Sequence, residues 1–171
     1  MLMGFFLGQV RLGARTQSER SWQEASVLAL CHSYDEALPY YVSLKHRFED
    51  NPYFLYNYAA VFTEAKEYEK ALKVALECRK YWADYDLELL LGDIYREKKD
   101  YKQAEEYYMS ASYMCPSRFL PLYQLYELYK CIGNTEKASE LAKILLEKPA
   151  KVNSALIKRI RYMVKKDGLI N

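Results

Sequence analysis

The stretch ELLLGDIYREKKDYKQAEEYYMSASYMCP, residues 88–116, decides the fold of this chain. It places Gly92 and Ala104 twelve residues apart, on either side of the short polar run 98–100. Its alanine recurs at intervals of 34, 33 and 34 residues, at Ala37, Ala71, Ala104 and Ala138. A constant interval of this length indicates one helical unit repeated four times.

The residues around each alanine explain why the unit repeats. Twelve positions earlier stand Ala25, Ala59, Gly92 and Tyr126, three of them small. Nine positions earlier stand Leu28, Phe62, Tyr95 and Tyr129, all of them large. A small residue on each of two helices lets their backbones approach closely, and the large neighbour fills the space beside the contact. Because each helix pair needs a neighbouring pair to cover its second face, we predict an all-α fold built by stacking about four helix pairs.

Composition and charge agree with one helical domain. With 171 residues, 6 glycines and 5 prolines, the chain is long enough for a buried core and poor in the residues that turn-rich β folds use. The net charge of +2 gives no reason to expect nucleic acid as a partner. From Lys143 onward, however, eight basic and two acidic residues give a local charge of +6. This segment is either the solvated face of a terminal helix or a surface for an anionic partner.

The third unit resembles a tetratricopeptide repeat (TPR), on Leu91, Gly92, Tyr95, Tyr101, Ala104, Tyr108, Ala111 and Pro116. The second unit resembles it through Ala59, Phe62, Tyr68, Ala71 and Cys78. The first and fourth depart from the pattern, since Trp22 is one place off the usual tryptophan and Tyr126 stands where a small residue belongs. The resemblance implies a right-handed α-α superhelix with units at residues 18–51, 52–84, 85–118 and 119–150, after a leader at residues 1–17.

A further helix is expected at the carboxyl end. Residues 153–167 continue at helical period, with one apolar side formed by Leu156, Ile160, Met163 and Val164. Asn153 or Ser154 suits the N-cap. The last pair of a repeat array leaves an apolar face open, so we predict that residues 151–171 form a basic capping helix.

Proline stands inside the second helix expected for the first unit. That helix begins in SYDEALPYY, residues 33–41. If its cap lies at residues 33–35, Pro39 falls within the first turn, where its missing N–H costs least.

The amino terminus MLMGFFLGQV is apolar and is followed by Arg11, Arg15 and Arg20. A spanning helix needs about 20 apolar residues, so this run does not cross a bilayer alone. A secretory signal carries its positive charge before the apolar run, not after it. Residues 1–17 are therefore either a flexible or peripherally packed leader or the end of a membrane segment, whose arginines would favour the cytoplasmic side for the repeats. We expect a cytoplasmic protein, at the inner face of the membrane if the leader contacts it, with the periplasm as the alternative.

A narrower resemblance rests on EALPYY, NPYFLYNYAAVF, YDLELLLGDIY, ASYMCPSRFLPLYQLYELY and KPAKVNSALIKRIR. Together these phrases look like the repeat tail that follows the membrane portion of O-antigen ligase- or polymerase-like proteins of bacterial surface-polysaccharide assembly. The resemblance implies a role in O-antigen assembly, with the apolar leader as the end of a last membrane helix. It carries no catalytic motif and implies no active site.

Motifs that carry chemistry are missing from the sequence. It contains no GxGxxG, GxxxxGKS/T, GxSxG or HExxH. The cysteines Cys31, Cys78, Cys115 and Cys131 are widely spaced, so we expect reduced thiols in or near the core and no metal site. Cys31 and His32 are adjacent at a helix end, where they point apart, and no third group orients them. We predict no enzyme activity and no cofactor.

The TPR resemblance implies a concave binding face, formed by the second, fifth, ninth, twelfth and thirteenth residues of each unit. In the first two units these positions hold Glu19, Trp22, Ser26, Ala29, Leu30, Tyr53, Tyr56, Ala60, Thr63 and Glu64. In the last two they hold Asp86, Leu89, Asp93, Arg96, Glu97, Leu120, Tyr123, Glu127, Lys130 and Cys131. The lysine and asparagine of a chaperone-type carboxylate clamp are missing from the fifth and ninth positions, so we do not expect recognition of a chaperone's acidic tail.

Eight of these residues are our groove candidates, because aromatic and arginine side chains dominate interface energies and charges select partners: Trp22, Tyr53, Tyr56, Asp93, Arg96, Tyr123, Glu127 and Lys130. The alternative for each tyrosine is packing between helices. The leading hypothesis is a non-catalytic scaffold that binds a protein or peptide segment, beside a membrane enzyme of polysaccharide assembly. One alternative is an accessory C-terminal region of such an enzyme, and another is a module that binds anionic surfaces through its basic helix. The oligomeric state is left open.

Overall fold

The computed structural model describes residues 3–152 and 154–169, with side chains described from Thr16 onward. The described residues form nine α-helices and one 3₁₀-helix, with no β-strand among them. They divide into two compact parts, an N-terminal half that ends at Trp82 and a C-terminal half that begins at Ala83. Each half is built from antiparallel helix pairs, which is the arrangement that the repeat predicts.

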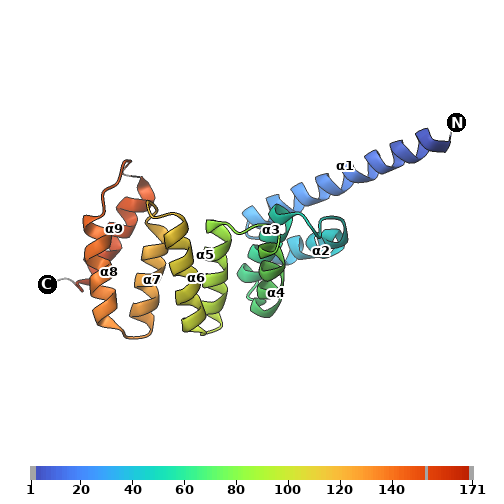
Figure 1. Ribbon diagram of the computed structural model, residues 1–171. Coiled ribbons are helices and arrows are strands. Elements are labelled where there is room, and N and C mark those ends of the chain that lie inside the picture. The colour runs from blue at the N-terminus through green and yellow to red at the C-terminus, as the bar shows by residue number, and fades with distance from the viewer. Residues whose placement is uncertain (1–2, 153, 170–171) are drawn as a thin grey trace. The chain divides into compact units, whose positions relative to one another are not determined.

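The N-terminal half contains two helix pairs, α1 (Met3–Leu30) with α2 (Tyr34–Leu44), and α3 (Pro52–Glu64) with α4 (Tyr68–Arg79). The 3₁₀-helix η1 (Lys45–Arg47) follows α2 directly. α1 is continuous over 28 residues and extends well beyond its partner α2 (Figure 1). The boundary expected between residues 17 and 18 therefore falls inside one helix. No helix among the described residues is both long and apolar enough to span a bilayer.

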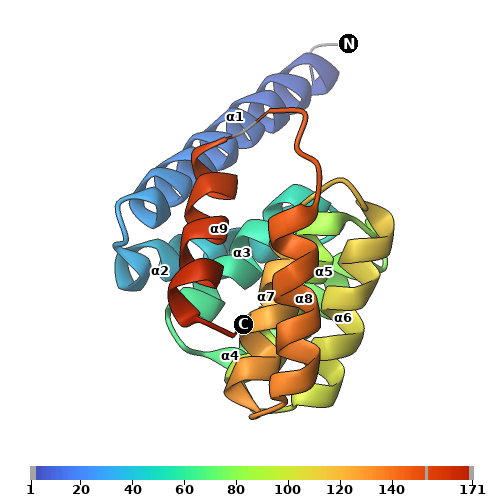
Figure 2. The same cartoon turned by 90° about the vertical axis from the view of Figure 1, so that its left-hand side faces the viewer.

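The C-terminal half contains α5 (Tyr85–Glu97), α6 (Tyr101–Met114), α7 (Leu120–Cys131), α8 (Thr135–Glu147) and α9 (Ala155–Asp167). Helices α5 to α8 pack side by side in chain order (Figure 1). After α8 the chain loops back, and α9 packs against α8 (Figure 2). One apolar core joins all five helices of this half.

Small residues lie at the helix contacts, as the sequence predicts. Fully buried are Ala25, Ala37, Ala59, Ala71, Ala104 and Ala138. Gly92 permits a close approach of α6, because a Cβ built on it would lie 2.4 Å from Cε1 of Tyr108. In the last pair the sizes are exchanged: Tyr126 is the large residue, and Ala142 stands where Tyr108 does in the pair before. Both Tyr126 and Ala142 are fully buried, so the departure from the repeat pattern is compensated within its own pair.

The turn inside each pair has the same hydrogen bonding. One residue of each turn has positive φ: His32 at 60°, Lys66 at 62°, Lys99 at 63° and Gly133 at 75°. The N–H of the following residue donates at 2.9 Å to a carbonyl five positions earlier, at Leu28, Phe62, Tyr95 and Tyr129. This pattern is the Schellman helix end, in which glycine is usual because it adopts positive φ at least cost. The repeat in the sequence is therefore matched by a repeated backbone conformation at the four turns.

The start of α2 corrects one expectation. Ser33 occupies the N-cap position and makes no capping hydrogen bond through its side chain. Because α2 begins at Tyr34, Pro39 is the sixth residue of the helix and lies in its second turn, so its expected place in the first turn is wrong. The proline leaves the carbonyl of Asp35 without its helical donor. Asp35 is exposed, so water can satisfy that carbonyl.

The C-terminal helix α9 covers the last pair. The Oγ atom of Ser154 accepts a hydrogen bond from the N–H of Ile157 at 3.4 Å and caps the helix, whereas Asn153 lies outside the described residues. Ile160 and Val164 are buried in the core, as expected. Leu156 is 49% exposed, so its expected place on the packed side is wrong. Ile157 packs there instead, because the buried face of the helix is centred on Ile160 and Val164.

Candidate functional site

A cavity of about 490 Å³ opens between α1, α2 and α3 in the N-terminal half. Most of its lining comes from the first helices of the two pairs: Ser26, Ala29, Leu30, Asn57, Ala60, Val61 and Glu64. Five of these occupy concave positions expected from the repeat: Ser26, Ala29, Leu30, Ala60 and Glu64. These five residues of the first helices of two units therefore lie around one hollow.

The second helix and the turn before it close one side of this cavity with His32, Tyr34 and Tyr41. The positive φ of His32 turns the chain so that its Nδ1 atom lies 2.6 Å from the Tyr34 hydroxyl. Desolvation and the neighbouring Glu64 carboxylate raise the pKa of that hydroxyl. A second hollow of about 350 Å³ shares His32, Tyr34 and Glu64 with the cavity and also touches Asp35, Glu36 and Lys66.

Three aromatic groove candidates belong to the N-terminal half, and each packs on another ring. The Trp22 ring centroid lies 5.2 Å from that of Phe48 and 5.5 Å from that of Phe54. Tyr53 and Tyr56 both contact Trp82, with centroids 5.4 Å and 6.1 Å away. Tyr53 is nevertheless 63% exposed. None of the three lines the cavity, so Trp22 and Tyr56 serve packing and Tyr53 offers an open surface outside it.

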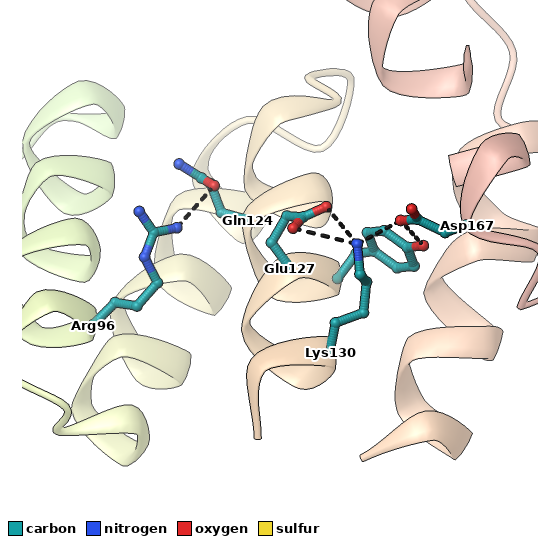
Figure 3. Close-up of polar contacts among 6 residues, drawn as sticks. Arg96, Gln124, Glu127, Lys130 and Asp167 are labelled. Carbon is teal, nitrogen blue, oxygen red and sulfur yellow. Dashed lines mark hydrogen bonds and ion pairs between the residues drawn. The ribbon is translucent and has the colours of Figure 1, made fainter. Parts of the chain in front are cut away.

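In the C-terminal half, Asp93 and Arg96 of α5 meet Gln124 of α7. Arg96 donates to Oε1 of Gln124 at 3.3 Å (Figure 3). The Gln124 amide donates in turn to Oδ1 of Asp93 at 3.0 Å. The Tyr108 hydroxyl donates to the same Asp93 oxygen at 2.6 Å. Burial and the Asp93 carboxylate together raise the pKa of Tyr108. These candidates therefore form a polar link between helices α5, α6 and α7.

The remaining candidates lie on α7 and meet the end of α9. Lys130 is paired with Glu127 at 3.2 Å and also with Asp167, the last residue of α9 (Figure 3). The Tyr126 hydroxyl donates to Asp167 at 2.8 Å. Tyr123 stacks near Tyr126, with centroids 6.1 Å apart, and burial followed by the Glu127 charge raises its pKa. Lys130 and Glu127 are thus already engaged by the chain itself.

Several residues of these sites were missed by reasoning from the sequence. Asn57 and Gln124 are amides at the sixth position of their units, inside first helices that are otherwise rich in apolar and aromatic residues. That contrast was a usable signal. Asp167 is the one acidic residue of a basic helix, but its position opposite Lys130 depends on how α9 folds back.

Among the described residues, no group of three or more histidine, cysteine, aspartate or glutamate side chains is arranged to hold a metal ion. Cys31 and Cys131 are exposed, Cys115 is half-buried and Cys78 is buried, so the expectation of thiols in or near the core holds for two of the four.

No protein-family model matches the chain, and no curated protein matches its sequence. Solved structures do resemble it. MamA, residues 41 to the end, from Desulfovibrio magneticus RS-1 is 18% identical with a TM-score of 0.70, and the match covers 85% of this chain and 76% of MamA. PilF of Pseudomonas aeruginosa is 17% identical with a TM-score of 0.65, covering 95% of this chain and 82% of PilF.

A third structure is YrrB, described as a TPR protein with an unusual peptide-binding site. It is 15% identical to this chain with a TM-score of 0.63, and the match covers 86% of this chain and 76% of YrrB. The chain therefore has the all-α TPR fold that the repeat predicted. The narrower resemblance to proteins of O-antigen assembly is not shown by these structures.

Proposed function

We propose that the chain is a non-catalytic interaction scaffold that holds a protein or peptide segment in the cavity between α1, α2 and α3. The observation that carries the proposal is the lining of that cavity. Five residues at concave positions of two successive repeats line this cavity of about 490 Å³: Ser26, Ala29, Leu30, Ala60 and Glu64. They come from two helices that are separate in the sequence. A volume in this range is typical of ligand pockets, which are usually about 300–1,000 Å³.

The chemistry of the lining suits a peptide. Ala29 and Ala60 keep the cavity open, and Asn57 lines it with an amide that can both donate to and accept from a peptide backbone. In the described part of the chain this amide has no hydrogen-bond partner of its own. The peptide-binding site of YrrB shows that the same fold serves such a role in another protein.

The proposal is tested by selecting binders from a displayed library of random peptides. Peptides enriched on the wild-type chain should be lost on Ala60→Arg, which places a long charged side chain in the cavity. Val42→Arg is the matched control, because it introduces the same residue at an exposed position of α2 outside the lining. Enrichment that survives Ala60→Arg, in a variant whose thermal unfolding matches that of the control, would contradict the assignment.

A finer proposal is the context of O-antigen assembly, either as a scaffold beside a membrane enzyme or as the accessory C-terminal region of an O-antigen ligase/polymerase-like enzyme. The continuity of α1 favours the second form, since one helix leads from residue 3 into the first repeat. This form predicts an open reading frame with several apolar segments directly before the codon of residue 1. The protein would then act at the cytoplasmic face of the membrane, with the periplasm as the alternative.

A second candidate function is binding to an anionic surface through α9. Its outward face carries Lys158, Arg159, Tyr162, Lys165 and Lys166, all exposed and opposite the buried Ile160 and Val164. Each basic residue near an anionic membrane contributes about 1 kcal/mol at low salt. The fraction of protein that sediments with phosphatidylserine vesicles should fall steeply as the salt concentration rises from about 0.05 to 0.2 M. Vesicle binding that does not change with salt would exclude this function.

A further inference from the structure

The cavity between α1, α2 and α3 is shaped for a large apolar side chain. Ala29 and Ala60 leave the space, and Tyr41 and Val61 form buried apolar walls. Leu30 lies at the mouth and is 80% exposed. An exposed leucine beside an open apolar cavity favours an apolar occupant, because both surfaces leave water when it binds.

The hollow next to the cavity is acidic. Its lining includes three acidic residues, Asp35, Glu36 and Glu64, and one basic residue, Lys66, which gives a net charge of −2 with histidine counted as neutral. No lysine or arginine in the described part of the chain forms an ion pair with Asp35, Glu36 or Glu64. The negative charge of this hollow is therefore available to a cation from outside.

The two hollows are neighbours, since both are lined by His32, Tyr34 and Glu64. In an extended peptide, side chains point alternately to opposite sides, so residues i and i+2 face the same surface about 7 Å apart. One peptide can therefore place one side chain in the cavity and the side chain two positions away in the acidic hollow.

We infer that the ligand of this site is an extended peptide with a large apolar residue and a lysine or arginine two positions apart. The apolar side chain fills the cavity, and the cation lies among Asp35, Glu36 and Glu64. The inference rests on the proposed function and adds the chemical class of the ligand. Peptides with an acidic residue at the second position are excluded by like charge.

The test uses the displayed peptide library with two charge variants of the full chain. The first is Asp35→Asn/Glu36→Gln/Glu64→Gln, which neutralises the hollow. The control is Glu24→Gln/Glu49→Gln/Asp50→Asn, which makes the same charge change at exposed positions outside both hollows. Affinities of the enriched peptides are then measured by fluorescence anisotropy at several salt concentrations.

We expect the peptides that bind the wild type but not Ala60→Arg to share a large apolar residue and a basic residue two positions apart. The order of these two residues along the peptide should be the same in all of them. Neutralising the hollow should weaken their binding about two- to fivefold per carboxylate, as exposed ion pairs do, and should flatten its salt dependence. The control variant should bind like the wild type. Ala60-dependent peptides without the basic residue, or with unchanged affinity for the neutralised variant, would overturn this inference and leave the proposed function standing. A library with no Ala60-dependent peptide would overturn both.

Discussion

Asp167, the last residue of α9, accepts a hydrogen bond of 2.8 Å from the hydroxyl of Tyr126 in α7. The two residues are 41 positions apart, and Lys130 of α7 forms an ion pair with the same carboxylate. This contact fixes the end of the capping helix to the side of α7 that carries groove candidates. A partner that engaged Lys130 would therefore compete with the chain's own C-terminal helix.

Asp167→Asn should lower the free energy of unfolding by about 0.5–1 kcal/mol, because a partly exposed ion pair and one charged hydrogen bond are lost. The hydrogen bond from Lys130 is the main reason that the pKa of Asp167 lies below its ordinary value, with Tyr126 adding to the effect. The stabilisation is therefore complete above the ordinary carboxyl pKa and is lost as the pH falls through the lowered folded-state pKa.

Urea unfolding of wild type and Asp167→Asn between about pH 2 and pH 7 measures this difference. The free energies of unfolding of the wild type and of Asp167→Asn should converge at the lowest pH. Glu140→Gln, at an exposed position of α8, is the control and should follow the wild type. A gap between wild type and Asp167→Asn that does not change with pH would contradict the role of the charged carboxylate.

Gly92→Ala should destabilise the C-terminal half by about 1–3 kcal/mol, the usual cost of overpacking. The new Cβ would lie 2.4 Å from the ring of Tyr108, so either that buried ring or one of the two helices must shift. In a Tyr108→Ala background the same change should become neutral or stabilising, because the clash is gone and alanine favours helix by about 1 kcal/mol over glycine. A double-mutant cycle measures this coupling, and additive effects would refute the close contact.

Lys99→Gly should stabilise the chain by up to about 1 kcal/mol, because residue 99 has a φ of 63°, a conformation that costs non-glycine residues about that much. Gly133→Ala, at the equivalent turn with a φ of 75°, should destabilise by a similar amount. The control Lys73→Gly, at an exposed position in the middle of α4, should destabilise by about 0.5–1 kcal/mol, which separates the effect of φ from that of losing a lysine. Thermal unfolding of the three variants provides the comparison.

Cys78 should resist thiol reagents in the folded chain. It is fully buried, its Sγ atom donates to the carbonyl of Pro52 at 3.2 Å, and burial raises the pKa of the thiol to about 11. At pH 8 the thiol therefore stays protonated and inert. Titration with Ellman's reagent should modify the exposed Cys31 and Cys131 quickly and Cys78 only after denaturation. Rapid modification of Cys78 in the native chain would contradict the burial of α4 against α3.

The fold could be predicted because its determinants are local and periodic. Ala37, Ala71, Ala104 and Ala138 mark the helix crossings, and the turn before each of them recurs at nearly the same interval. The exchange of sizes at Tyr126 and Ala142 could not be predicted from the pattern of one unit, because it depends on the volume available between two helices. The exposure of Leu156 likewise depends on how α9 is rotated against α8.

The candidate site was predictable only in part. Concave positions such as Ala29 and Ala60 do line the cavity, since the first helices carry them to one side. The aromatic candidates Trp22 and Tyr56 pack on rings from neighbouring segments, which a rule based on position alone does not anticipate. The pairing of Lys130 with Asp167 requires a helix that folds back over 37 residues, and no repeat position encodes it.

Photocrosslinking in the native cell tests the central claim most directly. A benzophenone amino acid is placed at Leu30, at the mouth of the cavity, and in a parallel chain at Val42, which is exposed elsewhere on α2. We predict that Leu30 captures a defined segment of one partner, that Ala60→Arg removes this product, and that Val42 does not form it. Equal capture from both positions, or a Leu30 product that persists in the Ala60→Arg chain, would contradict binding in the cavity.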